Sequence, residues 1–310
     1  MTIFLNIFVL LLSLAALVKG SSIFVKQASA IARRYRIPEF LIGITIVAMG
    51  TSLPELIISI VAAIQGNATI TITNVLGSSI ANIGFILAIT AIFGAVYIQR
   101  ESLKFDIPLS VSSVVLFLLI LYLSKGLITW AYGIVLLLFF VCYFLFRYFK
   151  LKKEEEHNLI PSHTKISVPF LLLGLLLVSV GGNFTVDSAI NLANLLDISE
   201  GFIGFTILSI GSSLPELIVS VIALKKKHYG LSLGNIVGSN FFNLFLIIGI
   251  SSTIMDLSFT EYLAELTILL AYNLALIIAS FIGKKYYISK LEGFSLLVSY
   301  LLLLVYLFFK

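Results

Sequence analysis

Long apolar runs alternate with short polar breaks along almost the whole chain. Each run is close to or above the roughly 20 residues that an α-helix needs to cross a hydrocarbon core of about 30 Å. The pattern predicts ten membrane-spanning helices, with coarse bounds at 3–19 (continuing to about 35), 39–64, 70–95, 105–124, 127–149, 166–196, 201–224, 231–255, 261–282 and 291–309. We therefore expect an all-α polytopic membrane fold.

Composition supports a lipid bilayer as the solvent of this chain. Hydrophobic residues make up 60% of the 310 residues and charged residues only 11%, roughly half or less of the charged share of a soluble domain. The net charge is +5, but the basic residues lie in short clusters between apolar runs, so a nucleic-acid partner is not expected. The single cysteine, Cys142, excludes an intramolecular disulfide and a cysteine-rich metal site. No feature indicates an obligate protein partner.

The two halves of the chain repeat each other. The segment IGITIVAMGTSLPELIISI at 42–60 matches IGFTILSIGSSLPELIVSV at 203–221, a spacing of 161 residues. The same spacing carries Asn74, Gly77, Ser78 and Asn82 onto Asn235, Gly238, Ser239 and Asn243. The self-match predicts a first repeat at 1–149, a polar linker at 150–165 and a second repeat at 166–310.

The repeats are expected to be inverted, because five spans per half place the start of the second half on the opposite side of the membrane. Basic residues cluster in alternate loops, at 33–36, 100–104, 150–153, 225–227 and 284–285, which the positive-inside rule makes cytoplasmic. Both termini are then extracellular. Inverted repeats are typical of secondary transporters with a site near mid-membrane. A duplicated membrane protein without transport is the alternative.

The first apolar run, at residues 3–17, also admits an interpretation as a cleaved secretory signal. No basic residue precedes this run, and Gly20 just beyond it corresponds to Gly181 in the second half. We therefore expect a retained first helix.

Two acidic residues, Glu55 and Glu216, stand near the middle of predicted spans, where an unpaired charge costs at least about 2.5–3.5 kcal/mol. Each follows a proline, Pro54 or Pro215, which lacks an N–H and clashes with the carbonyl four residues earlier. The helices are expected to break or bend there, leaving carbonyls around 48–51 and 209–212 without helical partners. The alternative is a protonated carboxyl that donates a hydrogen bond to a neighbouring helix.

Further polar residues accompany each glutamate. Thr51 and Ser212 lie one turn before the glutamates on the same face, and the next helix of each half carries a polar stripe with a spacing of four. For the outer members of these stripes, Asn74 and Asn235, a role in the site and interhelical hydrogen bonding are equally compatible with the pattern. Gly77 and Gly238 permit close packing.

The candidate ligands are all oxygen atoms, because the three histidines lie in loops. Oxygen ligands are typical of calcium and sodium sites. Two facing carboxylates carry a charge of −2, which one Ca²⁺ ion or a set of monovalent cations would balance. Competition of two ions for shared ligands predicts exchange.

The motifs GTSLPE at 50–55, GSSLPE at 211–216, GSSIAN at 77–82 and GSNFFN at 238–243 resemble the paired alpha-repeat motifs of the cation/calcium exchanger superfamily, in particular its prokaryotic sodium/calcium exchangers. The likeness covers the whole chain. It implies a non-enzymatic secondary antiporter in the cell membrane that exchanges Na⁺ for Ca²⁺ by alternating access, without a prosthetic group. A proton/calcium antiporter of the same fold and a passive cation channel are the alternatives.

The resemblance also implies which residues bind the ions. Glu55 and Glu216 would be the shared calcium and sodium ligands. Hydroxyl groups would come from Thr51, Ser52, Ser78, Ser212, Ser213 and Ser239, backbone oxygens from Ala48 and Ser209, and amides from Asn82 and Asn243. One departure concerns Asn243, where some relatives have aspartate, so this centre holds one carboxyl fewer and is expected to be independent of potassium.

Overall fold

The computed structural model describes residues 2–34, 48–98, 100–152, 167–225, 229–281 and 286–309. Its α-helices are α1 (Ile3–Arg34), α3 (Ala48–Thr51), α4 (Leu53–Ile64), α5 (Ala68–Ala81), α6 (Ala88–Phe93), α7 (Arg100–Lys104), α8 (Asp106–Leu123), α9 (Trp130–Lys152), α10 (Val168–Leu196), α11 (Glu200–Ile203), α12 (Ser209–Ser212), α13 (Leu214–Lys225), α14 (Tyr229–Phe242), α15 (Ile248–Ile254), α16 (Leu263–Phe281) and α17 (Lys290–Phe309). Three π-helical segments, η2 (Asn82–Leu87), η3 (Gly204–Leu208) and η4 (Asn243–Ile247), and a 3₁₀ turn, η5 (Thr260–Tyr262), complete the helical part.

Seven of the described helices are long and apolar enough to cross a membrane, and the bent pair Glu200–Ser212 with Leu214–Lys225 makes an eighth. Two further expected spans are represented by the shorter apolar helices Leu53–Ile64 and Trp130–Phe146. The first of these was expected to begin at residue 39, which lies outside the described residues. The fold is therefore a multi-pass membrane fold, and the total of ten spans stays a prediction.

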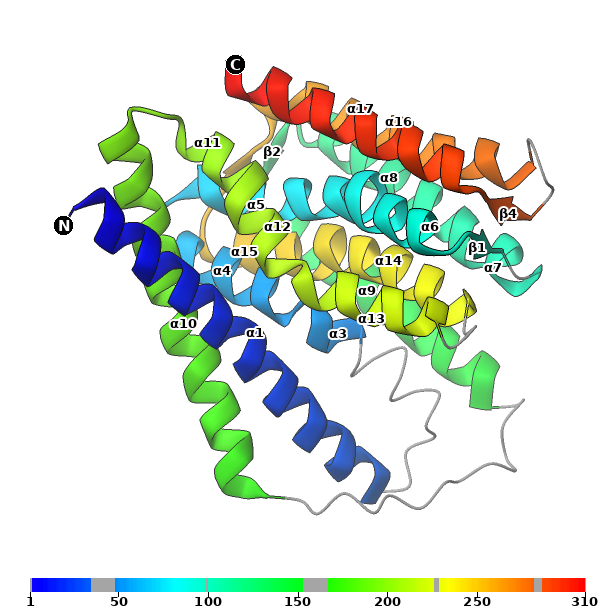
Figure 1. Ribbon diagram of the computed structural model, residues 1–310, viewed down its shortest axis with the longest axis horizontal. Helices are drawn as coiled ribbons and strands as arrows, with labels where there is room; N and C mark the ends of the chain where they lie inside the picture. Colours follow the sequence, from blue (N-terminus) through cyan, green and yellow to red (C-terminus); the bar gives the residue numbers. More distant parts are fainter. Residues whose placement is uncertain are drawn as a thin grey trace.

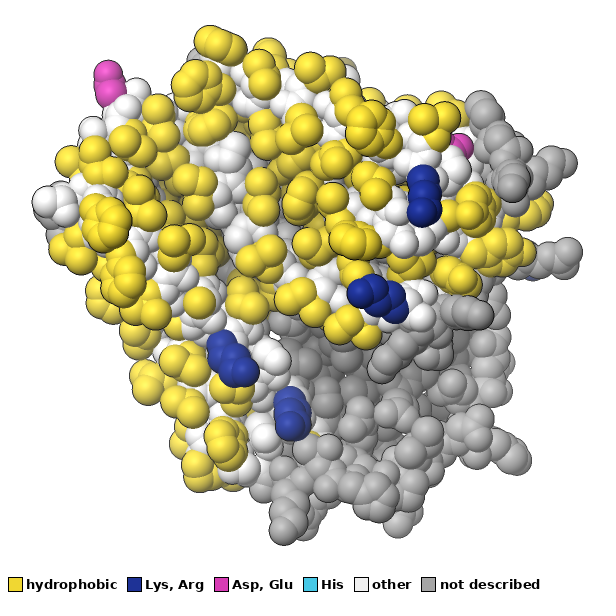
Figure 2. Space-filling model, in the orientation of Figure 1, with side chains coloured by type: hydrophobic (Ala, Val, Ile, Leu, Met, Phe, Trp, Pro, Cys, Tyr) yellow, Lys and Arg dark blue, Asp and Glu magenta, His cyan; other side chains and the backbone are white. Residues whose placement is uncertain are grey.

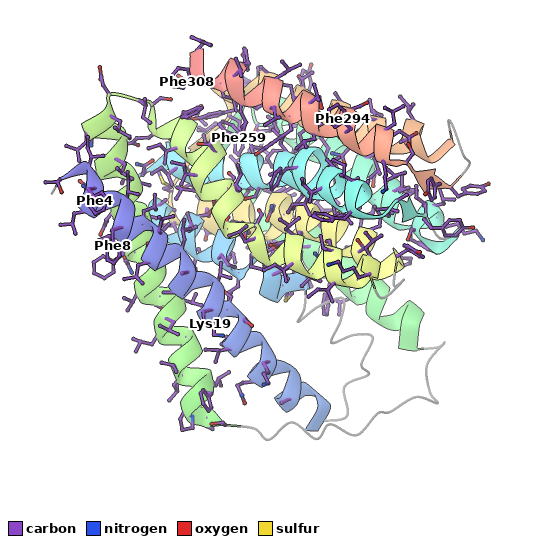
Figure 3. The ribbon with its side chains drawn as sticks, in the orientation of Figure 1. Phe4, Phe8, Lys19, Phe259, Phe294 and Phe308 are labelled. Atoms are coloured by element: carbon purple, nitrogen blue, oxygen red, sulfur yellow. The ribbon has the colours of Figure 1, made fainter. Side chains whose placement is uncertain are left out.

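Apolar side chains cover the outside of the molecule. Figure 2 shows hydrophobic atoms over most of the visible described surface, with few charged side chains among them. Phe4, Phe8, Phe294 and Phe308, labelled in Figure 3, are all exposed, Phe4 to 82%, whereas Phe259 is buried. Such a surface is compatible with lipid as the surrounding solvent.

Two small antiparallel pairings tie the halves together, and the sequence analysis did not predict them. Strand β1 (Val96–Tyr97) pairs with β4 (Tyr287–Ile288), and β2 (Leu127–Ile128) pairs with β3 (Leu257–Ser258). Apart from these four strands of two residues each, the described elements are helical, as expected. The strands lie in the connections between helices, where their pairing satisfies backbone N–H and C=O groups that have no helical hydrogen bond.

Two pairs of helices lie at opposite edges of the molecule in Figure 1. Helices α1 and α10 lie side by side along one edge, and α16 and α17 lie on the far side of the remaining helices. The approach of α1 to α10 is close, because a Cβ atom added to Gly20 would lie 2.9 Å from the carbonyl oxygen of Gly174. Between these two pairs, the spans Ala68–Phe93 and Ser232–Ile254 are mostly buried, with 83% and 78% of an 18-residue stretch in each inside the protein. The polar stripes on these two spans therefore face the protein interior.

Candidate ion-binding site

Both helices that carry the glutamates are broken, as the prolines predict. Helix α3 ends at Thr51 and α4 begins at Leu53, while α12 ends at Ser212 and α13 begins at Leu214. The second break bends the helix axis by 43°. Pro54 and Pro215 are the second residues of α4 and α13, and their missing N–H leaves the carbonyl four residues earlier without its usual helical donor.

The two breaks face each other, and the serine of each contacts the glutamate of the other. The Ser52 Oγ donates a hydrogen bond of 2.8 Å to Glu216 Oε1, and the Ser213 Oγ donates one of 2.8 Å to Glu55 Oε1. Ser239 Oγ on α14 donates a longer bond of 3.3 Å to Glu216 Oε1. Both glutamates are 1% exposed. Two motifs 161 residues apart thus form one buried centre.

Several oxygen atoms around this centre are buried and have no hydrogen-bond partner in the described protein. They are Glu55 Oε2, Glu216 Oε2, Ser78 Oγ, Asn82 Oδ1 and Asn243 Oδ1. A buried polar atom without a partner costs about 1–3 kcal/mol, so a concentration of them indicates a ligand. All five are oxygen ligands of the kind that hard cations prefer. No group of three His, Cys, Asp or Glu residues that could hold a metal occurs in the described part of the chain.

Some predicted ligands make other contacts in this structure. The Ser209 carbonyl accepts from Ser213 N at 3.2 Å and from Ser212 Oγ at 3.3 Å, so the expectation that it lacks partners is wrong. Only Ser213 separates α12 from α13, so the helical bond from Ser213 N to the Ser209 carbonyl is still formed. Thr51 Oγ1 donates to Asn235 Oδ1 at 3.3 Å. Ala48 is the first residue of α3, next to residues outside the described ranges.

The outer asparagines hold the broken helices to their neighbours. Asn74 Nδ2 donates to the Glu55 carbonyl at 3.1 Å and to Ser59 Oγ at 2.9 Å. The equivalent Asn235 Nδ2 donates to the Glu216 carbonyl at 3.4 Å and to Ser220 Oγ at 3.2 Å. For both residues, the bonds agree with the interpretation as interhelical hydrogen bonding.

Two residues near the centre were missed by the sequence analysis. Asn240 Oδ1 accepts from Asn82 Nδ2 at 2.8 Å, and Ser79 Oγ accepts from Asn243 Nδ2 at 3.3 Å. Ser79 and Asn240 are themselves 161 residues apart. They differ in residue type, so a search for identical repeated positions passes over them.

Comparison with known proteins identifies the family. Residues 5–149 and 166–309 match the family model described as sodium/calcium exchanger protein. The sodium/calcium exchanger MaX1 of Methanosarcina acetivorans is 35% identical, with 98% of this chain and 99% of that protein covered. The putative antiporter CaxA of Alkalimonas amylolytica is 33% identical, with 96% of each covered.

A solved structure agrees with the sequence relatives. The sodium-calcium exchanger NCX_Mj, soaked with 10 mM Na⁺ and zero Ca²⁺, superposes with a TM-score of 0.69 at 32% identity, and the match covers 98% of this chain and 99% of that one. Two sequence relatives, a family model and a solved structure therefore agree over nearly the full length. The chain belongs to the sodium/calcium exchanger family of membrane antiporters.

Proposed function

We propose that this protein is a secondary active antiporter that exchanges Na⁺ for Ca²⁺, with the ions bound between Glu55 and Glu216. The observation that carries the proposal is the facing pair of buried glutamates, each with one carboxylate oxygen held by a serine and the other without a protein partner. Two carboxylates supply a charge of −2, which Ca²⁺ neutralises in a medium of low dielectric. Relatives named sodium/calcium exchangers support the choice of ions.

The proposal includes two inverted repeats, at 1–149 and 166–310, joined by a cytoplasmic linker at 150–165. Equivalent hydrogen bonds recur at the spacing of 161, since the bond from Ser52 to Glu216 has its counterpart in the bond from Ser213 to Glu55. Such symmetry lets two conformations of similar energy open the same site to opposite sides of the membrane.

Unequal packing of the two halves supports alternating access. A Cβ atom on Gly182 of α10 would collide with the side chain of Ile57 on α4, so these helices are in close contact. The residue equivalent to Ile57 is Ile218 on α13, and it is 52% exposed. Likewise Ile222 on α13 is 48% exposed, whereas its equivalent on α4, Val61, packs against a buried cluster. One side of the site is therefore covered more fully than the other.

Coupling follows from the charge of the site. A pair of unneutralised carboxylates is costly to move past apolar side chains, so the helices change position only when cations balance the charge. Na⁺ and Ca²⁺ then compete for the same oxygens. Entry of one ion requires release of the other.

Transport of radioactive calcium into proteoliposomes tests the proposal. An outward Na⁺ gradient should drive uptake, and Glu55→Gln should abolish it. Asp256→Asn, which changes an exposed acidic residue on a loop, is the matched control and should transport normally. Uptake driven by a pH gradient alone would establish proton coupling instead, and calcium flux without any counter-ion would establish a channel.

A further inference from the structure

An asparagine side chain can ligate a cation only through its oxygen, because the NH₂ group carries partial positive charge. The two ends of the amide have nearly the same shape, so a half turn would replace the ligand by a repelling group. Asn82 and Asn243 are both 1% exposed, so no solvent is available to stabilise either orientation. The protein around them must therefore select the oxygen.

A chain of hydrogen bonds makes this selection for Asn82. Asn240 Nδ2 donates to the Ser79 carbonyl at 3.0 Å, and a backbone carbonyl can only accept. This bond turns Asn240 Oδ1 toward Asn82. That oxygen also can only accept, so it receives the bond of 2.8 Å from Asn82 Nδ2. The Asn82 Oδ1 is left at the other end of the amide, buried and without a protein partner.

Asn243 is held less strictly. Its Nδ2 donates to Ser79 Oγ at 3.3 Å, and its Oδ1 is again buried without a protein partner. A hydroxyl group can donate as well as accept, so this bond allows either orientation of the amide. The orientation of Asn82 is therefore determined by a backbone atom, and that of Asn243 by a rotatable hydroxyl.

We propose that Asn240 is a positioning residue that, anchored on the Ser79 carbonyl, turns the oxygen of the Asn82 amide toward the bound cation. Asn240 does not itself touch the ion. The inference rests on the proposed ion site and deepens it, because it assigns cation selectivity to a residue behind the ligands. The equivalent position in the first half is Ser79, which has no amide, so a positioning asparagine occurs only in the second half. It lies where α14 contacts α5.

Calcium binding to purified protein, measured by calorimetry, tests the proposal. Asn240→Ala should weaken Ca²⁺ binding roughly tenfold or more, the scale expected when an interaction with a charged group is lost. The matched control is Asn273→Ala. Asn273 on α16 is also fully buried and bonds to Ser110 and to the Leu269 carbonyl, neither of which belongs to the proposed site. Its removal should lower the unfolding temperature but leave Ca²⁺ affinity unchanged.

A double-mutant cycle separates positioning from general damage. In an Asn82→Asp background both terminal atoms are oxygens, so orientation no longer matters and Asn240→Ala should cost no Ca²⁺ affinity. An equal loss in both backgrounds, or no loss in the Asn82 background, would overturn the proposal. Asn240→Ser, which copies the residue of the other half, is the second variant if the alanine variant does not fold. Wild-type protein that binds no Ca²⁺ would instead refute the proposed function.

Discussion

The two carboxylate oxygens of each buried glutamate have different surroundings. Oε1 accepts a hydrogen bond from a serine hydroxyl of the opposite half, and Oε2 has no hydrogen-bond partner in the described protein. The serine thus orients the carboxylate through a hydrogen bond to only one of its two oxygens. The bonded oxygen defines where the carboxylate lies, and the other oxygen is available to a cation.

Each of the two serine bonds should contribute to stability, because both measure 2.8 Å and both are buried. Ser213→Ala leaves Glu55 Oε1 without its donor, whereas after Ser52→Ala the Glu216 Oε1 keeps the longer bond from Ser239. We expect each to lower the stability of calcium-free protein by about 1.5–3 kcal/mol. Thermal unfolding in detergent measures the effect, with Ser112→Ala as control, since the exposed Ser112 bonds only within its own helix. Unchanged stability of either serine variant would contradict the reciprocal arrangement.

Calcium should stabilise the wild-type protein by mass action, by about 2.7 kcal/mol at one hundred times the dissociation constant. Glu216→Gln removes one of the two charges that Ca²⁺ neutralises, so this stabilisation should disappear while the calcium-free protein still folds. The change in unfolding temperature on adding Ca²⁺ measures it. An undiminished shift in the glutamine variant would exclude Glu216 as a ligand.

At the scale of elements, interruptions of regular helix bring the site together. The prolines interrupt α3–α4 and α12–α13, and the π-helical segments η2 and η4 begin at Asn82 and Asn243 themselves. A π-helical turn widens the helix by one residue and occurs frequently at functional sites. The proline breaks follow from residue chemistry and were predicted. The π-helical turns carry no such residue signal, because the packing around them determines where the extra residue is accommodated.

Close approach of elements makes Gly77 on α5 intolerant of substitution. A Cβ atom there would lie 2.9 Å from the Cα of Phe205 and would also collide with Ser209, and backbone cannot move aside as a side chain can. Gly77→Ala should therefore destabilise the protein by about 1–3 kcal/mol.

The matched control is Gly234→Ala, on the corresponding helix α14. No atom lies within 4 Å of a Cβ built at Gly234. That variant should be neutral or more stable by up to about 1 kcal/mol, because alanine favours helix over glycine. Equal unfolding temperatures for the two variants would show that α5 does not pack tightly on η3 and α12.

At the scale of the whole molecule, the two halves contact each other through strands, through long helices and through side chains at the centre. The β pairings join β1 to β4 and β2 to β3, α1 packs along α10, and the central serines bond across the two motifs. A site shared between halves changes when the halves move relative to one another. This is the arrangement that alternating access requires.

The orientation of the molecule in the membrane stays a prediction and can be tested with fusions. Alkaline phosphatase joined to the C-terminus should be active, because the charge distribution places that end outside the cell. Green fluorescent protein at the same place should be dark. Fusions after Lys152, in the expected cytoplasmic linker, are the controls and should give the opposite result. Fluorescence at the C-terminus would reverse the topology.

The sequence was sufficient for the class of the fold and for most residues of the candidate site. Apolar runs of membrane length, the repeat at a spacing of 161 and the buried glutamates are properties of the chain itself. Lipid requires helices to satisfy their own backbone, so the spans follow from hydropathy. The pairing of Ser52 with Glu216 could not be read in the same way. It depends on how the two halves dock.

Local chemistry thus determined the membrane class, the repeat, the proline breaks and the acidic centre, because each depends on residues adjacent in the chain or repeated along it. Tertiary structure decided which oxygens remain without partners, where the π-helical turns form, and that Asn240 stands behind Asn82. These features depend on how distant segments pack, as in the bond between Asn82 and Asn240, 158 residues apart, and hydropathy and spacing carry no information about such contacts.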